Sequence, residues 1–308
     1  MRDRLAGGDL RALSRAISRV EDGQEDVLAL AEALWPARAA ARVVGVTGPP
    51  GAGKSTLVDA LIGRFRDAGH RVAVLAVDPS SPYSGGALLG DRIRMQRHAA
   101  DPAVFIRSLG TRGESGGLSR ATRESAVLCA AAGFGRVVVE TVGVGQTELE
   151  VAGVADQVLV LLVPESGDVV QTMKAGLLEC ADVFAVNKSD RAGAERLVKE
   201  LRAMVEEGPA ELPRAPVFPV SATEGTGISA LFDEVLVRLD RGERSPRRLP
   251  ARELAARLVG EESGRRAAAR ARAALAADGA AAPAGAALER GEANPYAVAR
   301  SLLAREAE

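Results

Sequence analysis

The chain has 308 residues, of which 47% are hydrophobic and 26% are charged, so it is long and apolar enough for a large folded domain and is not a disordered protein. Its 40 basic and 41 acidic residues leave a formal net charge of −1, which argues against a general nucleic-acid or membrane-surface binder. Two cysteines, Cys129 and Cys180, and two histidines, His70 and His98, lack ligand spacing, which excludes a disulfide framework and a Cys/His metal cage.

The N-terminal segment is rich in arginine and amphipathic, which raises the possibility of a transit peptide. Its acidic residues, Asp3, Asp9, Glu21 and Asp22, argue against that interpretation, and it lacks the apolar stretch of a signal peptide. No apolar run in the sequence approaches the roughly 20 residues that span a bilayer. We therefore expect a cytoplasmic protein with no membrane and no nucleic-acid partner.

Three kinds of segment follow one another along the chain. Residues 1–40 are predicted to be helical, with Leu10, Leu13, Ile17 and Val20 on one apolar stripe that we expect to dock onto the main domain. Short apolar runs then alternate with helix-length segments, and seven of these runs are predicted strands: residues 43–46, 72–77, 103–106, 137–140, 158–163, 183–187 and 217–221. From about residue 243 the pattern is helical again, with a break at 278–285 and a last helix capped by Asn294 and Pro295.

Alternation of buried strands and helices indicates an α/β fold with a mainly parallel sheet covered by helices on both faces. We therefore predict a helical arm at 1–40, an α/β domain at 41–242 and a C-terminal helical arm at 243–308.

A glycine-rich loop with the pattern G-x-x-x-x-G-K-[ST] lies between the first predicted strand and a helical segment, which makes the α/β domain a P-loop NTPase. Backbone N–H groups in such a loop, together with the helix N-terminus, bind phosphates. Lys54 is expected to reach the β- and γ-phosphates and to act in catalysis, and the Ser55 hydroxyl to ligate Mg²⁺. The nucleotide-binding loop is predicted to consist of Gly48, Pro49, Pro50, Gly51, Ala52, Gly53, Lys54, Ser55 and Thr56.

The tetrapeptide Asn187-Lys188-Ser189-Asp190 follows a predicted strand and selects GTP over ATP. The Asp190 carboxylate is able to accept two hydrogen bonds from guanine, whereas adenine presents no such pair of donors. Asn187 is expected to fix the loop and the base, and the stem of Lys188 to lie over the purine. After the last predicted strand, backbone N–H groups of Ser221, Ala222 and Thr223 are candidates for a contact with the guanine carbonyl.

Two acidic residues end predicted strands on the phosphate side, Asp78 and Glu140, and are candidates for holding Mg²⁺ directly or through water; the alternative is that each caps the next helix. Glycine-rich loops at 78–91 and 143–148 resemble segments that respond to the γ-phosphate. In the second loop, Gln146 is a candidate for orienting the attacking water, and a plain loop hydrogen bond is an equal alternative.

The strings GPPGAGKST, DPSSPYSGGALLGDRIRM, ETVGVGQTE, GDVVQTMKAGLLECAD and NKSD together resemble the MeaB/ArgK family of G proteins, which includes GTPases associated with methylmalonyl-CoA mutase. The resemblance extends to RALSRAISRVED near the N-terminus and NPYAVARSLL near the C-terminus. The chain departs from the family in its tail, because its single tryptophan is Trp35 and none follows the G domain.

The resemblance implies a GTP-hydrolysing chaperone of an adenosylcobalamin-dependent acyl-CoA mutase, with methylmalonyl-CoA mutase the first candidate. Such a protein gates cofactor loading and protects or reactivates the mutase. The resemblance also implies GTP or GDP with Mg²⁺ as ligands, Asp91 beside Asp78 and Glu140 at the metal, and a homodimer held partly by the C-terminal arm. It further marks the segment 167–182, with Gln171 and Lys174, as an additional switch that meets the partner; a solvated side chain is an equal alternative for Lys174.

Three alternatives stay open at this point. A metal-delivery GTPase shares the motifs, but it requires Cys or His ligands with suitable spacing. A kinase linked to amino-acid transport is disfavoured by NKSD and by the lack of an acceptor domain. A nucleotide-dependent binding module with negligible turnover is the third, because intrinsic G-protein rates are low until a partner completes the site. Which acyl-CoA mutase is served is likewise open.

Overall fold

The computed structural model describes residues 1–78, 95–98, 100–110, 120–141, 151–166, 180–208, 214–242, 251–276 and 278–304. The chain forms two compact units, Met1–Arg248 and Leu249–Glu308, and each is considered by itself. The division into three segments at residues 40 and 242 remains a prediction.

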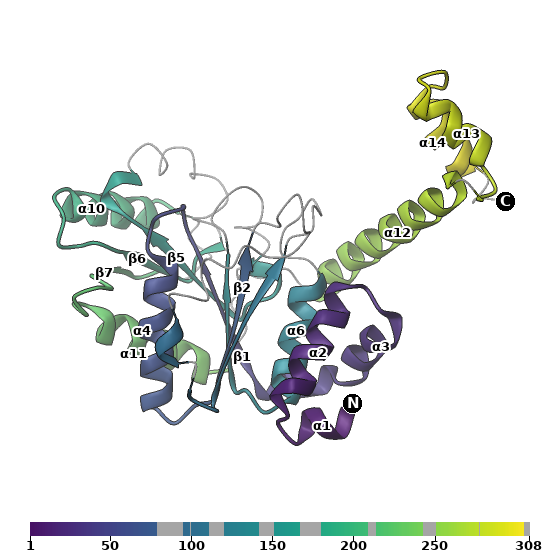
Figure 1. Ribbon diagram of the computed structural model, residues 1–308. Helices are drawn as coiled ribbons and strands as arrows, with labels where there is room; N and C mark the ends of the chain where they lie inside the picture. Colours follow the sequence, from purple (N-terminus) through teal and green to yellow (C-terminus); the bar gives the residue numbers. More distant parts are fainter. Residues whose placement is uncertain are drawn as a thin grey trace. The chain divides into compact units, whose positions relative to one another are not determined.

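The first unit is built on a seven-stranded sheet in the order β3-β2-β4-β1-β5-β6-β7, in which every neighbouring pair is parallel (Figure 1). All seven predicted strands are therefore present. The strands are β1 (Arg42–Thr47), β2 (Val72–Asp78), β3 (Val104–Gly110), β4 (Arg136–Glu140), β5 (Gln157–Leu162), β6 (Val183–Val186) and β7 (Val217–Pro219).

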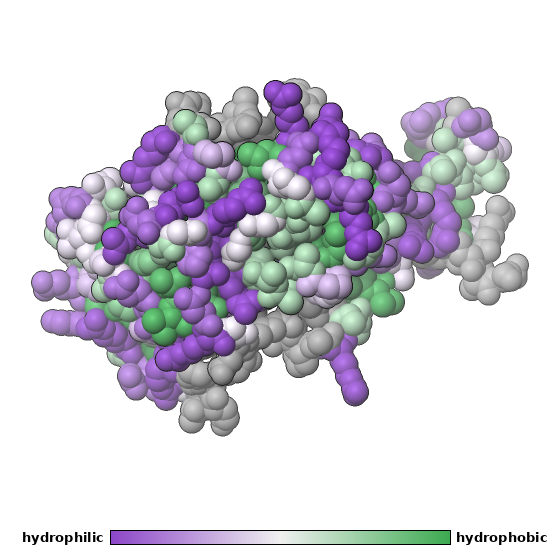
Figure 2. All heavy atoms as spheres, turned by 90° about the horizontal axis from the view of Figure 1, so that it is seen from below, coloured by the Kyte–Doolittle hydropathy of each residue, from purple (hydrophilic) through white to green (hydrophobic). Residues whose placement is uncertain are grey.

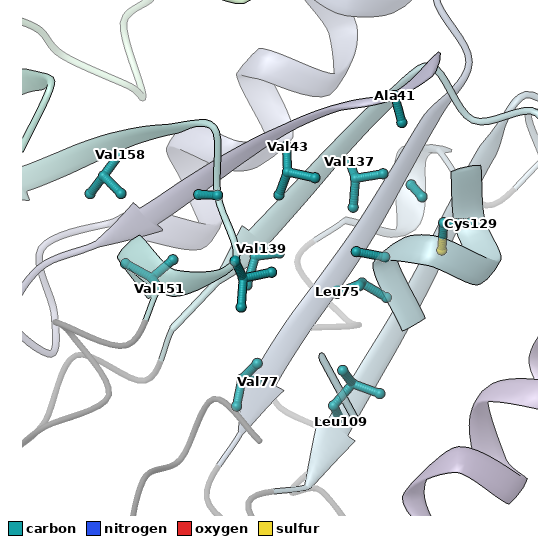
Figure 3. Close-up of a cluster of buried hydrophobic side chains, with 14 of the residues drawn as sticks. Ala41, Val43, Leu75, Val77, Leu109, Cys129, Val137, Val139, Val151 and Val158 are labelled. Atoms are coloured by element: carbon teal, nitrogen blue, oxygen red, sulfur yellow. The ribbon is translucent and has the colours of Figure 1, made fainter. Parts of the chain in front are cut away.

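Valine-rich strands form this sheet because both of its faces are buried, so apolar side chains are needed on both sides of each strand. Val43, Val137 and Val139 point to one face, where Cys129 and Val151 pack with them (Figure 3). Val44, Val46 and Val138 point to the other face, and there they meet the apolar sides of two helices. These helices are α4 (Lys54–Asp67) and α11 (Ile228–Asp240).

Helices of the N-terminal segment belong to the core of the first unit. They are α1 (Arg2–Ala6), α2 (Leu10–Glu21) and α3 (Glu25–Ala33), followed by the 3-10 helix η1 (Trp35–Ala40). Leu13, Ile17 and Val20 of α2 are buried in the same cluster as α6 (Arg120–Ala131), with Leu10 at its margin. The expected docking of the apolar stripe is therefore confirmed. Asp9 caps α2 by accepting a hydrogen bond from the N–H of Ala12 at 2.9 Å.

Among the described residues, the first unit also contains α10 (Ala194–Glu206) and three short 3-10 helices. The 3-10 helices are η2 (Gln96–His98), η3 (Val151–Gly153) and η4 (Pro164–Ser166). Figure 2 views the molecule from below, on the side away from the arrowhead of β2 in Figure 1, and shows hydrophilic and hydrophobic residues interspersed.

The described residues of the second unit form α12 (Ala251–Leu275), α13 (Ala282–Glu289) and α14 (Pro295–Ala304). Asn294 accepts a hydrogen bond from the N–H of Tyr296 at 2.9 Å, as expected for the cap of the last helix. The predicted break at 278–285 is too long, because α13 begins at Ala282 and accommodates Pro283 in its first turn, where proline needs no N–H donor. Among the described side chains of this unit, none is buried.

Across the described part of the chain, no helix is both long enough and apolar enough to cross a membrane.

Candidate functional site

The predicted site residues gather at one edge of the sheet because all seven strands are parallel and their carboxyl ends lie together. Gly48 follows β1, while Asp78 and Glu140 are the last residues of β2 and β4. Asn187 follows β6 directly, and Ser221 lies two residues beyond β7. The sheet therefore brings five motifs, scattered over about 170 residues of sequence, to a single edge.

The glycine-rich loop has a backbone that only glycine permits at three points. Gly48, Gly51 and Gly53 have φ angles of 142°, 76° and 88°. At Gly48 a Cβ atom would lie 2.0 Å from the carbonyl oxygen of Leu161, so the loop passes directly against the end of β5.

Lys54 is the first residue of α4, and its side chain folds back over the loop. Its ammonium donates to the carbonyl oxygens of Gly48 at 2.9 Å and Pro49 at 3.1 Å, and the residue is 7% exposed. The charge is thus held where the loop and the N-terminus of α4 meet, which is a site suited to an anionic phosphate.

Ser55 and Glu140 are brought into contact from positions 85 residues apart in the chain. The Ser55 hydroxyl donates to a Glu140 carboxylate oxygen at 2.7 Å, and both residues are buried. Thr141, the next residue after Glu140, donates from its hydroxyl to that of Thr47 at 2.9 Å. A hydroxyl and a carboxylate at this point are the hard oxygen ligands that Mg²⁺ prefers, so the residues present fit that ion.

The remaining residues predicted for the phosphate side are only partly described. Asp78 stands at the end of β2, where its backbone is paired with Gly110 of β3. The Asp78 side chain and the whole of Asp91, Gln146, Gln171 and Lys174 lie outside the described residues.

Asn187 connects three loops of the site. Its side-chain amide donates to the carbonyl oxygen of Ala52 in the glycine-rich loop at 2.8 Å. Its side-chain oxygen accepts a hydrogen bond from the N–H of Ala222 at 3.0 Å. The residue is 4% exposed, so these bonds are shielded from water. Asn187 therefore fixes the phosphate loop against the two loops that are candidates for holding the base.

The position of Asn187 also explains why residue 53 is a glycine, which the sequence alone assigned only to the phosphate loop. A Cβ atom at Gly53 would lie 2.5 Å from the side-chain nitrogen of Asn187. The pattern G-K-[ST] marks the glycine, but no local signal in the sequence names Asn187 as the neighbour that requires it.

The two candidate base-binding loops have distinct backbones. Lys188 has a φ of 56°, the only positive value among the described non-glycine residues, and Asp190 is exposed at the following turn. Ser221 is buried, and its N–H donates to the carbonyl of Thr226 at 2.9 Å. Because the N–H of Ala222 already donates to Asn187, a contact between that N–H and a guanine carbonyl would have to share or replace this bond.

The described residues contain no group of three or more His, Cys, Asp or Glu side chains that would hold a metal ion. Cys129 is fully buried, and burial raises the pKa of its thiol far above the ordinary value, which keeps it from serving as a thiolate ligand. Within the described part of the chain, the metal-delivery alternative thus has no cluster of ligands to support it.

Comparisons with known proteins bear on the family and the fold of the chain. Residues 11–258 match the family described as methylmalonyl-CoA mutase-associated GTPase MeaB. A protein of Pyrococcus abyssi named as a GTPase is 47% identical over 249 residues, which are 80% of this chain and 77% of that protein. The mitochondrial methylmalonic aciduria type A homolog of Mus musculus is 42% identical over 195 residues, 62% of this chain and 47% of that protein.

A crystal structure of an LAO/AO transport system kinase has the same fold, with a TM-score of 0.66 and 24% identity over 100% of this chain and 96% of that one. The predicted P-loop NTPase fold and the predicted family are both confirmed. The chain is a nucleotide-binding GTPase that belongs to the MeaB family of methylmalonyl-CoA mutase-associated GTPases.

Proposed function

We propose that the chain is a Mg²⁺-dependent GTPase that serves in the cytoplasm as a chaperone of an adenosylcobalamin-dependent acyl-CoA mutase, gating cofactor loading and protecting or reactivating the mutase. The observation that carries the partner assignment is the match of residues 11–258 to the mutase-associated family. The name of the mouse relative, which refers to methylmalonic aciduria, favours methylmalonyl-CoA mutase as the partner.

Guanine is the proposed base. The exposed Asp190 carboxylate accepts hydrogen bonds from the ring N–H and the exocyclic amine, and Lys188 covers the purine. Asn187 precedes both residues in the same loop, and its bonds to Ala52 and Ala222 tie that loop to the phosphate loop and to the loop after β7.

The phosphates are proposed to lie along Gly48–Thr56, with Lys54 exchanging its bonds to loop carbonyls for bonds to phosphate oxygens. Ser55 and Glu140 would hold Mg²⁺, with Asp78 and Asp91 as further acids of the site. The ion, when bound, neutralises charge on the β- and γ-phosphates. Gln146 is proposed to orient the attacking water.

The C-terminal unit supports the proposal of a homodimer. None of the described side chains of its helices is buried, although ordering a helical segment costs conformational entropy that burial normally offsets. We propose that the arm, residues 243–308, packs against the arm of a second copy, while 1–40 and 41–242 form the helical arm and the GTPase domain. The segment 167–182, with Lys174, is proposed to face the mutase.

The test measures GTP turnover by the purified chain alone and with purified mutases specific for methylmalonyl-CoA, isobutyryl-CoA or ethylmalonyl-CoA. We expect slow turnover that one of these mutases accelerates, and we expect Lys54→Ala to abolish both rates because the phosphates lose their buried cation. Unchanged turnover in Lys54→Ala would refute the proposed site. Turnover that responds to none of the mutases would refute the partner.

Capture from lysate then identifies the acyl-CoA. The tagged chain is loaded with a non-hydrolysable GTP analogue in one arm and with GDP in the other. Recovery of a cobalamin-dependent mutase in unequal amounts supports the proposal, whereas recovery of a transporter component or a metalloenzyme in its place contradicts it.

A further inference from the structure

A carboxylate from the N-terminal segment contacts the end of β3, one of the two edge strands of the sheet. Glu21, the last residue of α2, accepts a hydrogen bond from the guanidinium of Arg107 in β3 at 2.8 Å. Its second carboxylate oxygen accepts one from the backbone N–H of Gly110 at 3.2 Å. The same guanidinium nitrogen of Arg107 also donates to the Ser18 hydroxyl at 2.8 Å. Two residues of α2 thus hold the last turn of this helix against β3.

The position of Gly110 makes this contact relevant to the nucleotide site. β3 lies at one end of the strand order, and β2 is its neighbour among the described strands. Glu21 supplies an acceptor to a backbone N–H at the end of this edge strand, a group that would otherwise need water. Gly110 is also the residue paired with Asp78, the last residue of β2 and a proposed Mg²⁺-side acid.

We propose that Glu21 is a positioning residue for the Mg²⁺ side of the nucleotide site. Through Gly110 and Arg107 it holds the carboxyl end of β3, and through the β2–β3 register it holds the backbone at Asp78. The inference rests on the proposed function, because Asp78 matters to the nucleotide only if the site binds Mg²⁺ with GTP. Its consequence is that α2, which lies outside the GTPase motifs, influences metal-dependent nucleotide binding.

Burial makes the contact sensitive to substitution. The Glu21 side chain is 8% exposed and that of Arg107 is 26% exposed, so water replaces the carboxylate poorly. Glu21→Gln keeps an oxygen that accepts from Gly110 but leaves the Arg107 cation without its counter-charge, and Glu21→Ala removes both interactions. The strand end is then free to shift, and Asp78 with it.

The chain offers a matched control at the amino ends of the strands, opposite the edge that carries the nucleotide motifs. Arg38 of η1 and Asp156 form an ion pair at 2.9 Å whose side chains are 16% and 22% exposed. This pair also ties the N-terminal segment to the core, but Asp156 accepts a hydrogen bond from the N–H of Val43, near the start of β1. Asp156→Asn therefore disturbs a comparable contact at the amino ends of the strands, away from the nucleotide edge.

The experiment follows binding of a fluorescent GTP analogue to the full-length chain while Mg²⁺ is titrated, alongside thermal unfolding of each variant without nucleotide. For Glu21→Gln we expect the Mg²⁺ concentration at half-maximal binding to rise about tenfold, the scale on which groups that orient metal ligands act, with a larger rise for Glu21→Ala. Asp156→Asn should lower the unfolding temperature as Glu21→Gln does, yet leave the Mg²⁺ requirement as in the wild type.

Each result is decisive. Equal Mg²⁺ requirements in Glu21→Gln and the wild type would overturn the inference, as would an equal rise in Asp156→Asn, because the effect would then be one of general stability. If the wild type bound the analogue without any need for Mg²⁺, the proposed function itself would be contradicted. The wild-type titration detects that outcome independently of the variants.

Discussion

Replacing Asn187 with alanine removes two hydrogen bonds, one that joins its loop to the phosphate loop and one that joins its loop to the loop after β7. The carbonyl of Ala52 loses its donor at 2.8 Å, and the N–H of Ala222 loses its acceptor at 3.0 Å. Ala52 is fully buried, and Asn187 is 4% exposed, so water enters poorly at the vacated position.

The expected cost follows from these two bonds. A typical intramolecular hydrogen bond contributes about 1 kcal/mol net, and a buried polar group left without a partner costs roughly 1–3 kcal/mol. Two bonds, one at a fully buried carbonyl and one at a half-buried N–H, give a loss of about 2–4 kcal/mol in the free energy of unfolding. Nucleotide affinity should fall as well, because the phosphate loop and the base loop are no longer held together.

Urea denaturation and GDP titration measure the two effects in the same preparation. The other asparagine, Asn294, supplies the control, since it caps α14 of the second unit through an exposed side chain. Asn294→Ala should leave GDP affinity unchanged. If Asn187→Ala lost less than about 1 kcal/mol and bound GDP as the wild type does, the bridging role derived from its contacts would be wrong.

Three further predictions concern recognition of the guanine base, a histidine near the amino end of β2, and the packing of the core. Asp190→Asn should weaken GTP relative to ATP by roughly 1–3 kcal/mol, measured by competition binding; equal selectivity before and after the change would exclude the base site. Burial and the nearby Arg136 cation lower the pKa of His70 below 6.5, so the unfolded chain takes up the proton first as the pH falls. Stability should therefore decrease as the pH drops through about 6.5, and His70→Gln should flatten that decrease in denaturation curves at several pH values; an unchanged slope would contradict it. Gly45→Ala would place a Cβ atom 2.3 Å from a buried valine side chain and should cost about 1–3 kcal/mol, whereas Gly63→Ala, with open space around it in α4, should be neutral or stabilising; equal unfolding midpoints would refute this contrast.

The strand predictions show where apolar patterning stops being informative. The run at 103–106 predicted a strand that ended before Arg107, yet β3 continues to Gly110. Two polar residues interrupt the apolar run, and the guanidinium of Arg107 pairs with the carboxylate of Glu21, 86 residues earlier, and donates to the Ser18 hydroxyl. At the other edge of the sheet, β7 ends at Pro219, before the predicted end at residue 221, and Ser221 instead bridges to Thr226.

The sequence-based prediction of the nucleotide site rested on local motifs. The strand–loop–helix setting of Gly48–Thr56 and the tetrapeptide at Asn187 are short-range patterns, because a backbone that must bend around phosphates or present a carboxylate to a base needs particular residues at fixed spacing. Family membership followed from the same strings. The parallel sheet followed from buried runs that alternate with helices.

Sequence alone therefore determined the fold class, the family and the phosphate loop of this protein. Tertiary structure alone decided which partners the key side chains have: Asn187 with Ala52 and Ala222, and Ser55 with Glu140. The physical reason is that such contacts join segments 35 to 135 residues apart, and their proximity is set by strand order and register. No local periodicity encodes that order, so these contacts emerge only when the chain is folded.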